Sequence, residues 1–395
     1  MRNALPYPVY DADNHYYESA DAITRHLPKK YAKSLQFVQV NGRTKLAIGG
    51  HISDYIPNPT FDVVAAPGAH LKYYRAENTE GLSLREITGP AIKSTPPFRN
   101  GADRLLVMDA QHIHATLMFP TLFSAIERRM SYDHDLLYAA VHSLNQWASE
   151  EWGFDRQGRI YATPVISLAD IDQAVKELDW VLANGARTVV LRPAPVPGYR
   201  GSRSPGFPEF DPFWARVNEA KIFVALHASD SGYDQITQMW IGGQEWKPFE
   251  PDPFSNSLRI IDRAISDTVS ALICHGVFDR HRDVRVACIE NGAFWVDPLI
   301  KTLNHVYGQM PQSFKQHPTD VFKRHFFVAP FNEDSVPDLV GQIGADRVLF
   351  GSDWPHPEGV VEPLDFLEEL KDLSAADQQK IMSSNLKGLL EGVRD

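Results

Sequence analysis

Four polar side chains in this sequence stand where they could hold a divalent metal ion. A short apolar run leads into the segment DADNH, and alternate residues of a strand point to the same face, so Asp13 and His15 can face the same space. His227 and Asp353 each come just after another apolar run. Carboxylate and imidazole groups bind zinc or manganese, and two of each leave a position open for water or substrate. The sequence therefore predicts a metal centre formed by Asp13, His15, His227 and Asp353.

Five further residues near the ends of apolar runs are candidates for catalysis or substrate binding. Glu290 can accept hydrogen bonds, take a proton or join the metal shell, and we expect it to be catalytic. His356 and Trp354 lie in the loop after the last run, where we expect His356 to orient the substrate and Trp354 to contact it. Arg192 suits bidentate capture of a substrate carboxylate, or an ion pair with an acid such as Glu290. His275 lies near a helix end, so a structural role competes with substrate binding.

The elements that would position these residues are eight short strands separated by helices. Most of the apolar runs are rich in Val and Ile, which is typical of strands buried on both faces of a parallel sheet. The predicted strands are 9–13, 113–119, 160–166, 188–192, 222–226, 284–289, 325–329 and 347–351. The predicted helices are 134–152, 168–184, 256–272, 293–306 and 362–372, with Ser167 as an N-cap and Gly185 as a C-terminal stop. This alternation predicts an α/β (β/α)₈ barrel, in which catalytic groups lie at the carboxyl ends of the strands.

Two long segments interrupt the regular alternation. Residues 14–100 form an insertion after the first strand, and the Asn41-Gly42 pair inside it predicts a tight β-hairpin turn. Residues 228–255 form a second long loop, which is a possible lid. The tryptophans of this loop can line a pocket for a ring, or they can pack the loop down. We expect residues 1–395 to form a single domain.

The motifs resemble those of the amidohydrolase superfamily, in particular the branch that includes aminocarboxymuconate-semialdehyde decarboxylase and the resorcylate-type decarboxylases. The resemblance is carried by Asp13-Asn14-His15, by His227, by the segment GVFDRHRDVRVACIENG at 276–292 and by GSDWPH at 351–356. It implies a metal-dependent barrel enzyme, and a homodimer. One residue departs from the pattern of this branch. The sixth strand of those decarboxylases ends in a His-Gly pair, whereas this sequence has Glu290 at the equivalent place.

The departure at Glu290 decides the order of the functional hypotheses. We expect a hydrolase that acts on a small, cyclic or aromatic carboxylated compound, with Asp353 as the general base for a metal-activated water. The alternative is a non-oxidative decarboxylase of an aromatic or muconate-like acid, in which a carboxylate protonates the ring carbon. A non-catalytic barrel that binds small molecules is the third hypothesis.

Composition excludes several other classes of partner. The formal net charge of -11 argues against nucleic acid as a partner, because phosphate binding needs a clustered cationic surface. The two cysteines, Cys274 and Cys288, are too few for a disulfide framework and suit a reducing compartment. The first residues lack the apolar stretch of a signal peptide, and no apolar run is long enough to span a membrane. We therefore expect a cytoplasmic enzyme with a small-molecule substrate.

Overall fold

A ring of short parallel strands forms the centre of the molecule. The computed structural model describes residues 4–53, 55–198, 201–244, 246–247, 250–332 and 334–392. The regular strands of the ring are β1 (Tyr10–Asp11), β8 (Ala115–Pro120), β9 (Ile160–Ala162), β10 (Thr188–Leu191), β11 (Phe223–His227), β12 (Arg285–Ile289) and β13 (Phe326–Val328). Neighbouring strands pair in parallel from β1 through β8 to β9 and from β10 through to β13.

Single backbone contacts close this ring. A parallel bridge between Val165 and Val190 joins the chain after β9 to β10. A bridge between Val328 and Val348 joins β13 to the segment 347–351, and the Phe350 carbonyl accepts a hydrogen bond of 2.7 Å from the Ala12 amide. The predicted (β/α)₈ barrel is therefore confirmed.

Three predicted strands are clearly shorter or less regular than expected. The strand predicted at 9–13 is regular only over Tyr10–Asp11. The strand predicted at 160–166 ends at Ala162, because Pro164 has no amide proton to donate to a neighbour. The segment 347–351 does not form a regular strand and contributes only bridges. It then turns sharply, since Asp353 adopts a positive φ of 53°.

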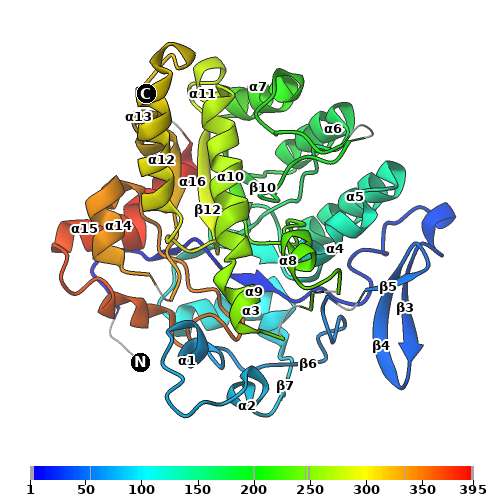
Figure 1. The fold of residues 1–395 in the computed structure, drawn as a ribbon. Helices are drawn as coiled ribbons and strands as arrows, with labels where there is room; N and C mark the ends of the chain where they lie inside the picture. Colours follow the sequence, from blue (N-terminus) through cyan, green and yellow to red (C-terminus); the bar gives the residue numbers. More distant parts are fainter. Residues whose placement is uncertain are drawn as a thin grey trace.

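Helices surround the ring (Figure 1). The longer ones are α3 (Gly101–Ala110), α5 (His134–Glu151), α6 (Ile171–Ala183), α7 (Asp211–Ala220), α10 (Ile260–Cys274), α12 (Val296–Gln309), α13 (Pro318–His325), α14 (Val336–Ile343) and α16 (Asn385–Glu391). The shorter ones are α1 (Leu71–Tyr74), α2 (Leu84–Thr88), α4 (Leu122–Ile126), α8 (Asp234–Trp240), α9 (Pro253–Ser257), α11 (Val277–Arg280) and α15 (Ala375–Gln379). None of the described helices is both long enough and apolar enough to cross a membrane.

The structure tests two predicted helix ends and one predicted helix. The cap of α6 is Asp170, whose side chain accepts a hydrogen bond from the Gln173 amide, so the prediction of Ser167 was wrong by three residues. Gly185 follows the end of this helix with a φ of 93°, as its role as a stop requires. The helix predicted at 362–372 is instead a 3-10 helix over Pro363–Glu368.

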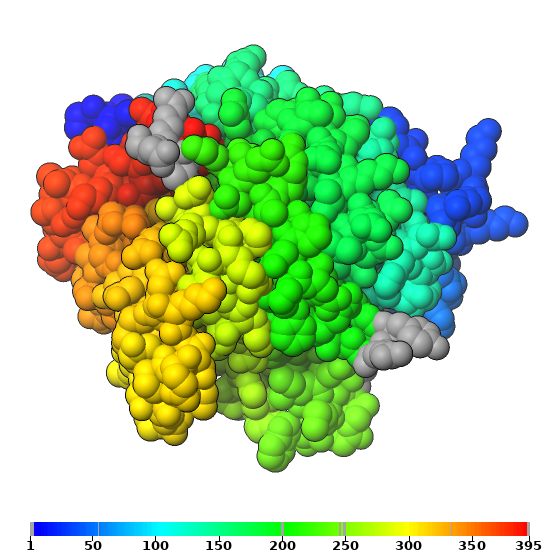
Figure 2. Space-filling model, turned by 90° about the horizontal axis from the view of Figure 1, so that it is seen from above, coloured from blue at the N-terminus to red at the C-terminus, as the bar shows by residue number. Residues whose placement is uncertain are grey.

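The insertion after the first strand begins with β2 (His15–Tyr16) and carries a projecting sheet. Strands β3 (Leu35–Val40) and β4 (Arg43–Ile48) form the predicted hairpin, and Asn41 and Gly42 have φ angles of 51° and 75°. Strand β5 (His51–Ser53) adds a third strand. This sheet stands away from the barrel in Figure 1, and the residues around it project from the body in Figure 2.

The rest of the insertion meets the second long segment. Strands β6 (Val63–Val64) and β7 (Ile92–Lys93) pair, and they lie with α1 and α2 on the lower side of the molecule in Figure 1, near α9. The Tyr73 hydroxyl accepts a hydrogen bond from Asn256 of α9, and the rings of Tyr55 and Trp246 lie 6.4 Å apart. The two irregular segments thus contact each other at two places.

Candidate metal centre

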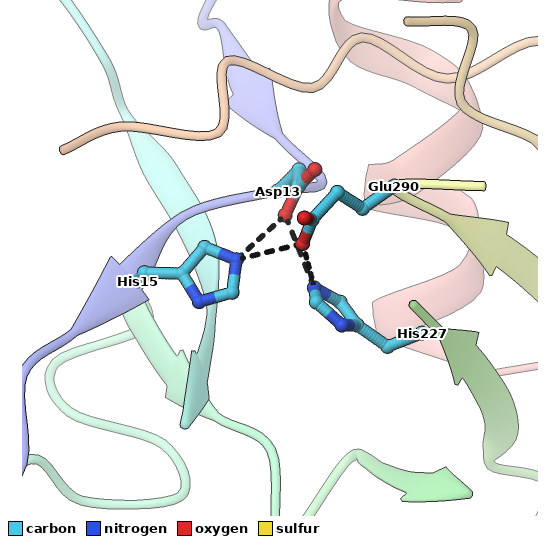
Figure 3. Close-up of side chains that lie close together, drawn as sticks. All are labelled: Asp13, His15, His227 and Glu290. Carbon is cyan, nitrogen blue, oxygen red and sulfur yellow. Dashed lines mark ion pairs between the residues drawn. The ribbon is translucent and has the colours of Figure 1, made fainter. Parts of the chain in front are cut away.

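Four side chains from three strand ends converge on one point inside the barrel mouth. The Asp13 Oδ1 atom lies 3.4 Å from His15 Nε2 and 3.5 Å from His227 Nε2. The Glu290 Oε2 atom lies 3.3 Å from His15 Nε2 and 3.0 Å from His227 Nε2. Figure 3 shows the four groups pointing toward one another. The structure therefore brings together three of the four predicted ligands, and Glu290 stands as the fourth member of the group.

Asp353 lies beside this group and contacts both His15 and His356. Its Oδ1 atom is 3.4 Å from His15 Nε2 and 2.9 Å from His356 Nδ1. Among the described residues, His15, Glu290, Asp353 and His356 form a second set with potential ligand atoms within 4.8 Å of one another. The His356 ring also stacks on His15, with ring centroids 3.8 Å apart.

The hydrogen bonding of the group fits a bound cation. The atoms Asp13 Oδ1, His15 Nε2, His227 Nε2 and both carboxylate oxygens of Asp353 are buried and have no hydrogen-bond partner among the described residues. Buried polar atoms are almost always paired, so such a cluster needs a ligand at its centre. His227 Nδ1 lies 2.8 Å from the Ala228 carbonyl, to which it can only donate. In the neutral ring Nε2 then keeps its lone pair for a metal ion, which would displace any proton from it. Carboxylates and imidazoles together suit a divalent ion such as manganese or zinc.

Burial and charge shift the pKa values of His227 and Glu290 in favour of their charged forms, and those of Asp353 and His356 in favour of their neutral forms. Burial lowers the pKa of His227, but Glu290 and Asp13 outweigh this effect and raise it to about 10. Burial raises the pKa of Glu290, but the two imidazoles beside it outweigh burial and hold that pKa far below its usual range. At Asp353 burial and repulsion from Glu290 and Asp13 act together, and they raise its pKa well above the usual value. Burial lowers the pKa of His356 well below normal. Without a cation at the centre, burial and charge thus favour the neutral forms of both Asp353 and His356.

A buried carboxylate fixes the strand that carries Asp13. Asp11 accepts hydrogen bonds from the Ser352 amide at 3.0 Å, the Ser352 hydroxyl at 2.6 Å, the Asp13 amide at 3.1 Å and the Asn14 side chain at 3.0 Å. Burial still raises the pKa of Asp11 to about 7. These bonds tie the first strand to the last one, next to Asp353.

A fully buried arginine holds the other side of this strand. Arg104 of α3 donates to the carbonyls of His15 and Pro97, each at 2.7 Å, and to the Asn14 side chain. Burial lowers its pKa to about 9. Its guanidinium group lies 4.4 Å from the centre of the Trp354 ring. Trp354 was predicted to contact the substrate. Its side chain is 7% exposed and packs against Arg104.

Backbone conformations set the direction of the two carboxylates. Glu290 and Asp353 have φ angles of 57° and 53°, which residues other than glycine rarely adopt. A Cβ atom on Gly351 would lie 2.7 Å from that of Asp13, and one on Gly359 would lie 2.4 Å from the Asp353 carbonyl oxygen. Glycine is needed at both places because the chain folds back tightly onto the centre.

Two predicted substrate-binding residues have polar partners outside the four-residue group. Arg192 donates to the Asp230 carbonyl at 3.0 Å, and its charge acts on Glu127, so its acidic neighbour is Glu127 rather than Glu290. His275 caps the C-terminal end of α10, is exposed, and lies 2.7 Å from the Ser204 hydroxyl. The structure does not bring His275 to the centre, because α10 leads into β12 at the end of the barrel opposite Glu290.

Comparison with known proteins identifies the family. Residues 12–385 match the family described as Amidohydrolase. The chain belongs to the amidohydrolase family. This amidohydrolase is 42% identical to an amidohydrolase of Mycobacterium avium subsp. paratuberculosis, with 99% of each chain covered and a TM-score of 0.93.

More distant relatives of this amidohydrolase carry the name of a decarboxylase. It is 24% identical over 313 residues to gamma-resorcylate decarboxylase of Rhodococcus jostii, which covers 73% of this chain and 86% of the relative. A dihydroxybenzoic acid decarboxylase of Polaromonas, solved with manganese and the inhibitor 2-nitroresorcinol, has a TM-score of 0.58 at 15% identity, with 97% of each chain covered. The resemblance predicted from the sequence is confirmed, and these relatives favour the decarboxylase alternative over the hydrolase that we placed first.

Proposed function

We propose that this amidohydrolase is a metal-dependent decarboxylase of an aromatic acid. The observation that carries the proposal is the pairing of Asp353 with His356 beside the four-residue group. The Thr121 hydroxyl donates to the Tyr16 carbonyl at 2.8 Å, and its oxygen lies 3.0 Å from His356 Nε2. It therefore accepts a hydrogen bond from Nε2, and neutral His356 turns a lone pair on Nδ1 toward Asp353. The two groups lie 2.9 Å apart, and a proton placed between them would make Asp353 an acid.

The residues of the site then divide the reaction between them. Asp13, His15, His227 and Glu290 would hold the ion, with Asp353 at its edge. When bound, a divalent ion supplies a positive charge that binds and polarises the oxygens of the substrate. Asp353 gives its proton to the ring carbon that bears the carboxylate. The carbon–carbon bond then breaks, its electron pair remains with the ring, and carbon dioxide leaves. His356 holds Asp353 in position and returns a proton to it from solvent.

The curated relatives support this choice of substrate class. They share the name gamma-resorcylate decarboxylase, and the Rhodococcus jostii protein covers 73% of this chain. Phe119 supplies an apolar surface at the centre, because its ring lies 4.2 Å from that of His227. A planar ring with a carboxylate beside a hydroxyl would present two oxygens to the ion and one ring carbon to Asp353.

Hydrolysis is the second candidate, and Glu290 is the observation that favours it. Its carboxylate lies within 3.3 Å of both His15 Nε2 and His227 Nε2. An additional carboxylate at this place could orient a water molecule for attack on an ester or amide carbon. The proposed role of Asp353 as an acid opposes this reading, because a general base must begin the reaction without a proton.

One experiment separates the two candidates. Manganese-loaded protein is incubated with 2,6-dihydroxybenzoate and other hydroxybenzoates, and separately with lactones and amides, in deuterated and in ¹⁸O-labelled water. We expect carbon dioxide from an aromatic acid and one solvent deuteron on the ring carbon that lost it. Labelled oxygen in a product, with no carbon dioxide from any acid, would contradict the proposal and favour hydrolysis.

A further inference from the structure

A second imidazole–carboxyl pair lies beside the metal centre. His70 belongs to the insertion at the start of α1, and Glu358 belongs to the loop that follows Asp353. The His70 amide donates to the Pro357 carbonyl at 2.7 Å, and the Asn332 side chain donates to the Glu358 carbonyl at 2.5 Å. The two side chains are therefore held by backbone contacts from separate parts of the chain.

The hydrogen bonds around His70 fix which of its ring nitrogens carries the proton. Thr88 donates its hydroxyl proton to the Leu84 carbonyl at 2.7 Å. The Thr88 oxygen lies 2.8 Å from His70 Nε2, so it accepts a hydrogen bond from that nitrogen. The other nitrogen, Nδ1, then presents a lone pair in the neutral ring. His70 is thus a hydrogen-bond acceptor on the side that faces Glu358.

Burial and repulsion from Glu290 raise the pKa of Glu358 to about 7, so above this pH two acceptors face one gap. The Glu358 Oε2 atom lies 3.9 Å from His70 Nδ1, which is too far for a direct hydrogen bond. Both atoms are buried, and neither has a hydrogen-bond partner among the described residues. The His70 side chain is only 6% exposed. A donor that enters this gap would satisfy two buried acceptors at once.

The gap lies next to the loop that carries Asp353 and His356, because the Gly68 amide donates to the His356 carbonyl at 3.3 Å. The charge of Glu358 interacts with those of Glu290, His15 and Asp13. Tyr17 is near both carboxyl groups, since Glu358 and Asp353 each act on its hydroxyl. Only four residues separate Asp353 from Glu358, and Gly359 brings the loop back against the Asp353 carbonyl.

We propose that Glu358 and His70 form an acceptor pair that recognises a hydroxyl group on the substrate. The inference rests on the proposed function and narrows its substrate to hydroxylated aromatic acids. The hydroxyl proton enters the gap, where the carboxylate and the imidazole both accept it. An acid without this hydroxyl leaves two buried acceptors unpaired, and a site built this way discriminates strongly against it. Both residues are specificity-determining and take no part in breaking the bond.

The two imidazoles near the centre support this division of roles. His356 and His70 each place Nε2 on a threonine hydroxyl and Nδ1 toward a carboxyl group. At His356 the separation is 2.9 Å, so one proton fits directly between the imidazole and the carboxyl group. At His70 the separation is 3.9 Å, so the pair is complete only with an added donor.

The test measures binding, so it does not depend on turnover. Manganese-loaded protein is titrated in a calorimeter with benzoate, with 2-, 3- and 4-hydroxybenzoate, with 2,6-dihydroxybenzoate and with the corresponding methoxy compounds. For at least one ring position we expect a hydroxyl to tighten binding about tenfold or more relative to hydrogen or methoxy, since hydrogen bonds to charged groups are strong. Glu358→Gln should abolish this preference, because its amide nitrogen can fill the gap by donating toward His70.

Two further variants make the outcome decisive. Glu358→Leu removes the acceptor, and its melting temperature and manganese content show whether the fold and the centre survive. Glu362→Gln changes an exposed carboxylate of the same loop and should keep the preference. No gain from a hydroxyl at any position, or a gain that persists in Glu358→Gln, would overturn the inference. Carbon dioxide release without a hydroxyl preference would overturn the inference and leave the proposed function intact. A hydroxyl preference without carbon dioxide release would support the inference and contradict the proposed function.

Discussion

Asp353 Oδ1 lies 2.9 Å from His356 Nδ1, beside the four-residue metal group. Thr121 accepts a hydrogen bond from the opposite side of the imidazole, so neutral His356 presents a lone pair to Asp353. The segment 347–351 and the loop after it therefore place at the edge of the metal centre the carboxyl group that we propose as the acid. A proton on this carboxyl group can be delivered to a carbon atom.

Replacement of Asp353 by asparagine should leave the geometry and remove the acid. The amide can still donate to His356 Nδ1, but it has no proton to give to the ring carbon. We expect the rate of carbon dioxide release to fall by about 10²–10⁴-fold, as is typical for loss of a general acid, with a much smaller change in substrate affinity. Single-turnover rates and calorimetric titration measure the two effects, and the exposed Asp372→Asn is the control. Nearly unchanged turnover would remove Asp353 from the mechanism.

Metal binding should stabilise the folded protein through Asp13. An ion that binds only the folded state at 100 times its dissociation constant adds about 2.7 kcal/mol to the free energy of unfolding. We expect manganese or zinc to raise the melting temperature of chelator-treated protein, and Asp13→Ala to lose both the rise and the bound metal. The exposed Asp172→Ala on α6 should behave like the original protein. An equal rise in Asp13→Ala would show that the ion binds elsewhere.

The barrel was predictable because each strand is a local pattern. The apolar runs, the Asn41-Gly42 turn and the spacing of Asp13 and His15 all lie within a few residues, so no knowledge of distant contacts is needed. The one strand that failed to form regularly, at 347–351, passes directly into the turn that aims Asp353, and no signal in its composition reveals that turn.

The parts of the site that the sequence did not reveal depend on contacts across the chain. Arg104 lies 89 residues from His15 and was hidden in a segment with no catalytic pattern. The pairing of His70 with Glu358 depends on the path of the insertion, which its Pro/Gly-rich sequence does not specify. The position of Glu290 within the four-residue group rests on a positive φ angle immediately after a strand. The sequence predicted Glu290 as a catalytic residue and gave membership of the metal shell as one of its roles.

A histidine away from the centre should make stability depend on pH. His325 is buried at the end of α13, with Nδ1 2.8 Å from the Val284 carbonyl. Burial, with further help from nearby arginines, lowers its pKa to about 4, below the value of about 6.5 for an unfolded chain. The unfolded state therefore binds the proton first as pH falls. The contribution of neutral His325 to the free energy of unfolding is therefore complete above pH 6.5 and is lost as pH falls to about 4.

The variant His325→Asn should flatten this dependence. Its amide can still donate to the Val284 carbonyl but takes no proton. Between pH 6.5 and 4 we expect the original protein to lose up to about 3 kcal/mol more free energy of unfolding than the variant. Denaturant titrations at several pH values, with chelator present throughout, measure the difference. The exposed His305→Asn is the control, and parallel curves for the original protein and His325→Asn would contradict the assignment.

Glu290 provides the sharpest test of how the centre is built. Its Oε2 atom lies 3.0 Å from His227 Nε2 and 3.3 Å from His15 Nε2. At this position Glu290 could be a metal ligand or could act on the substrate directly. Glu290→Gln removes the negative charge and should weaken manganese binding, whereas Glu290→His supplies another ligand atom of a kind the ion accepts. We expect Glu290→His to retain metal and to release carbon dioxide from the same aromatic acid. A general base that orients water cannot be replaced in this way, because the imidazole would compete for the ion instead of holding water. Loss of all turnover in Glu290→His with full metal occupancy would therefore assign Glu290 a direct part in the reaction and favour hydrolysis.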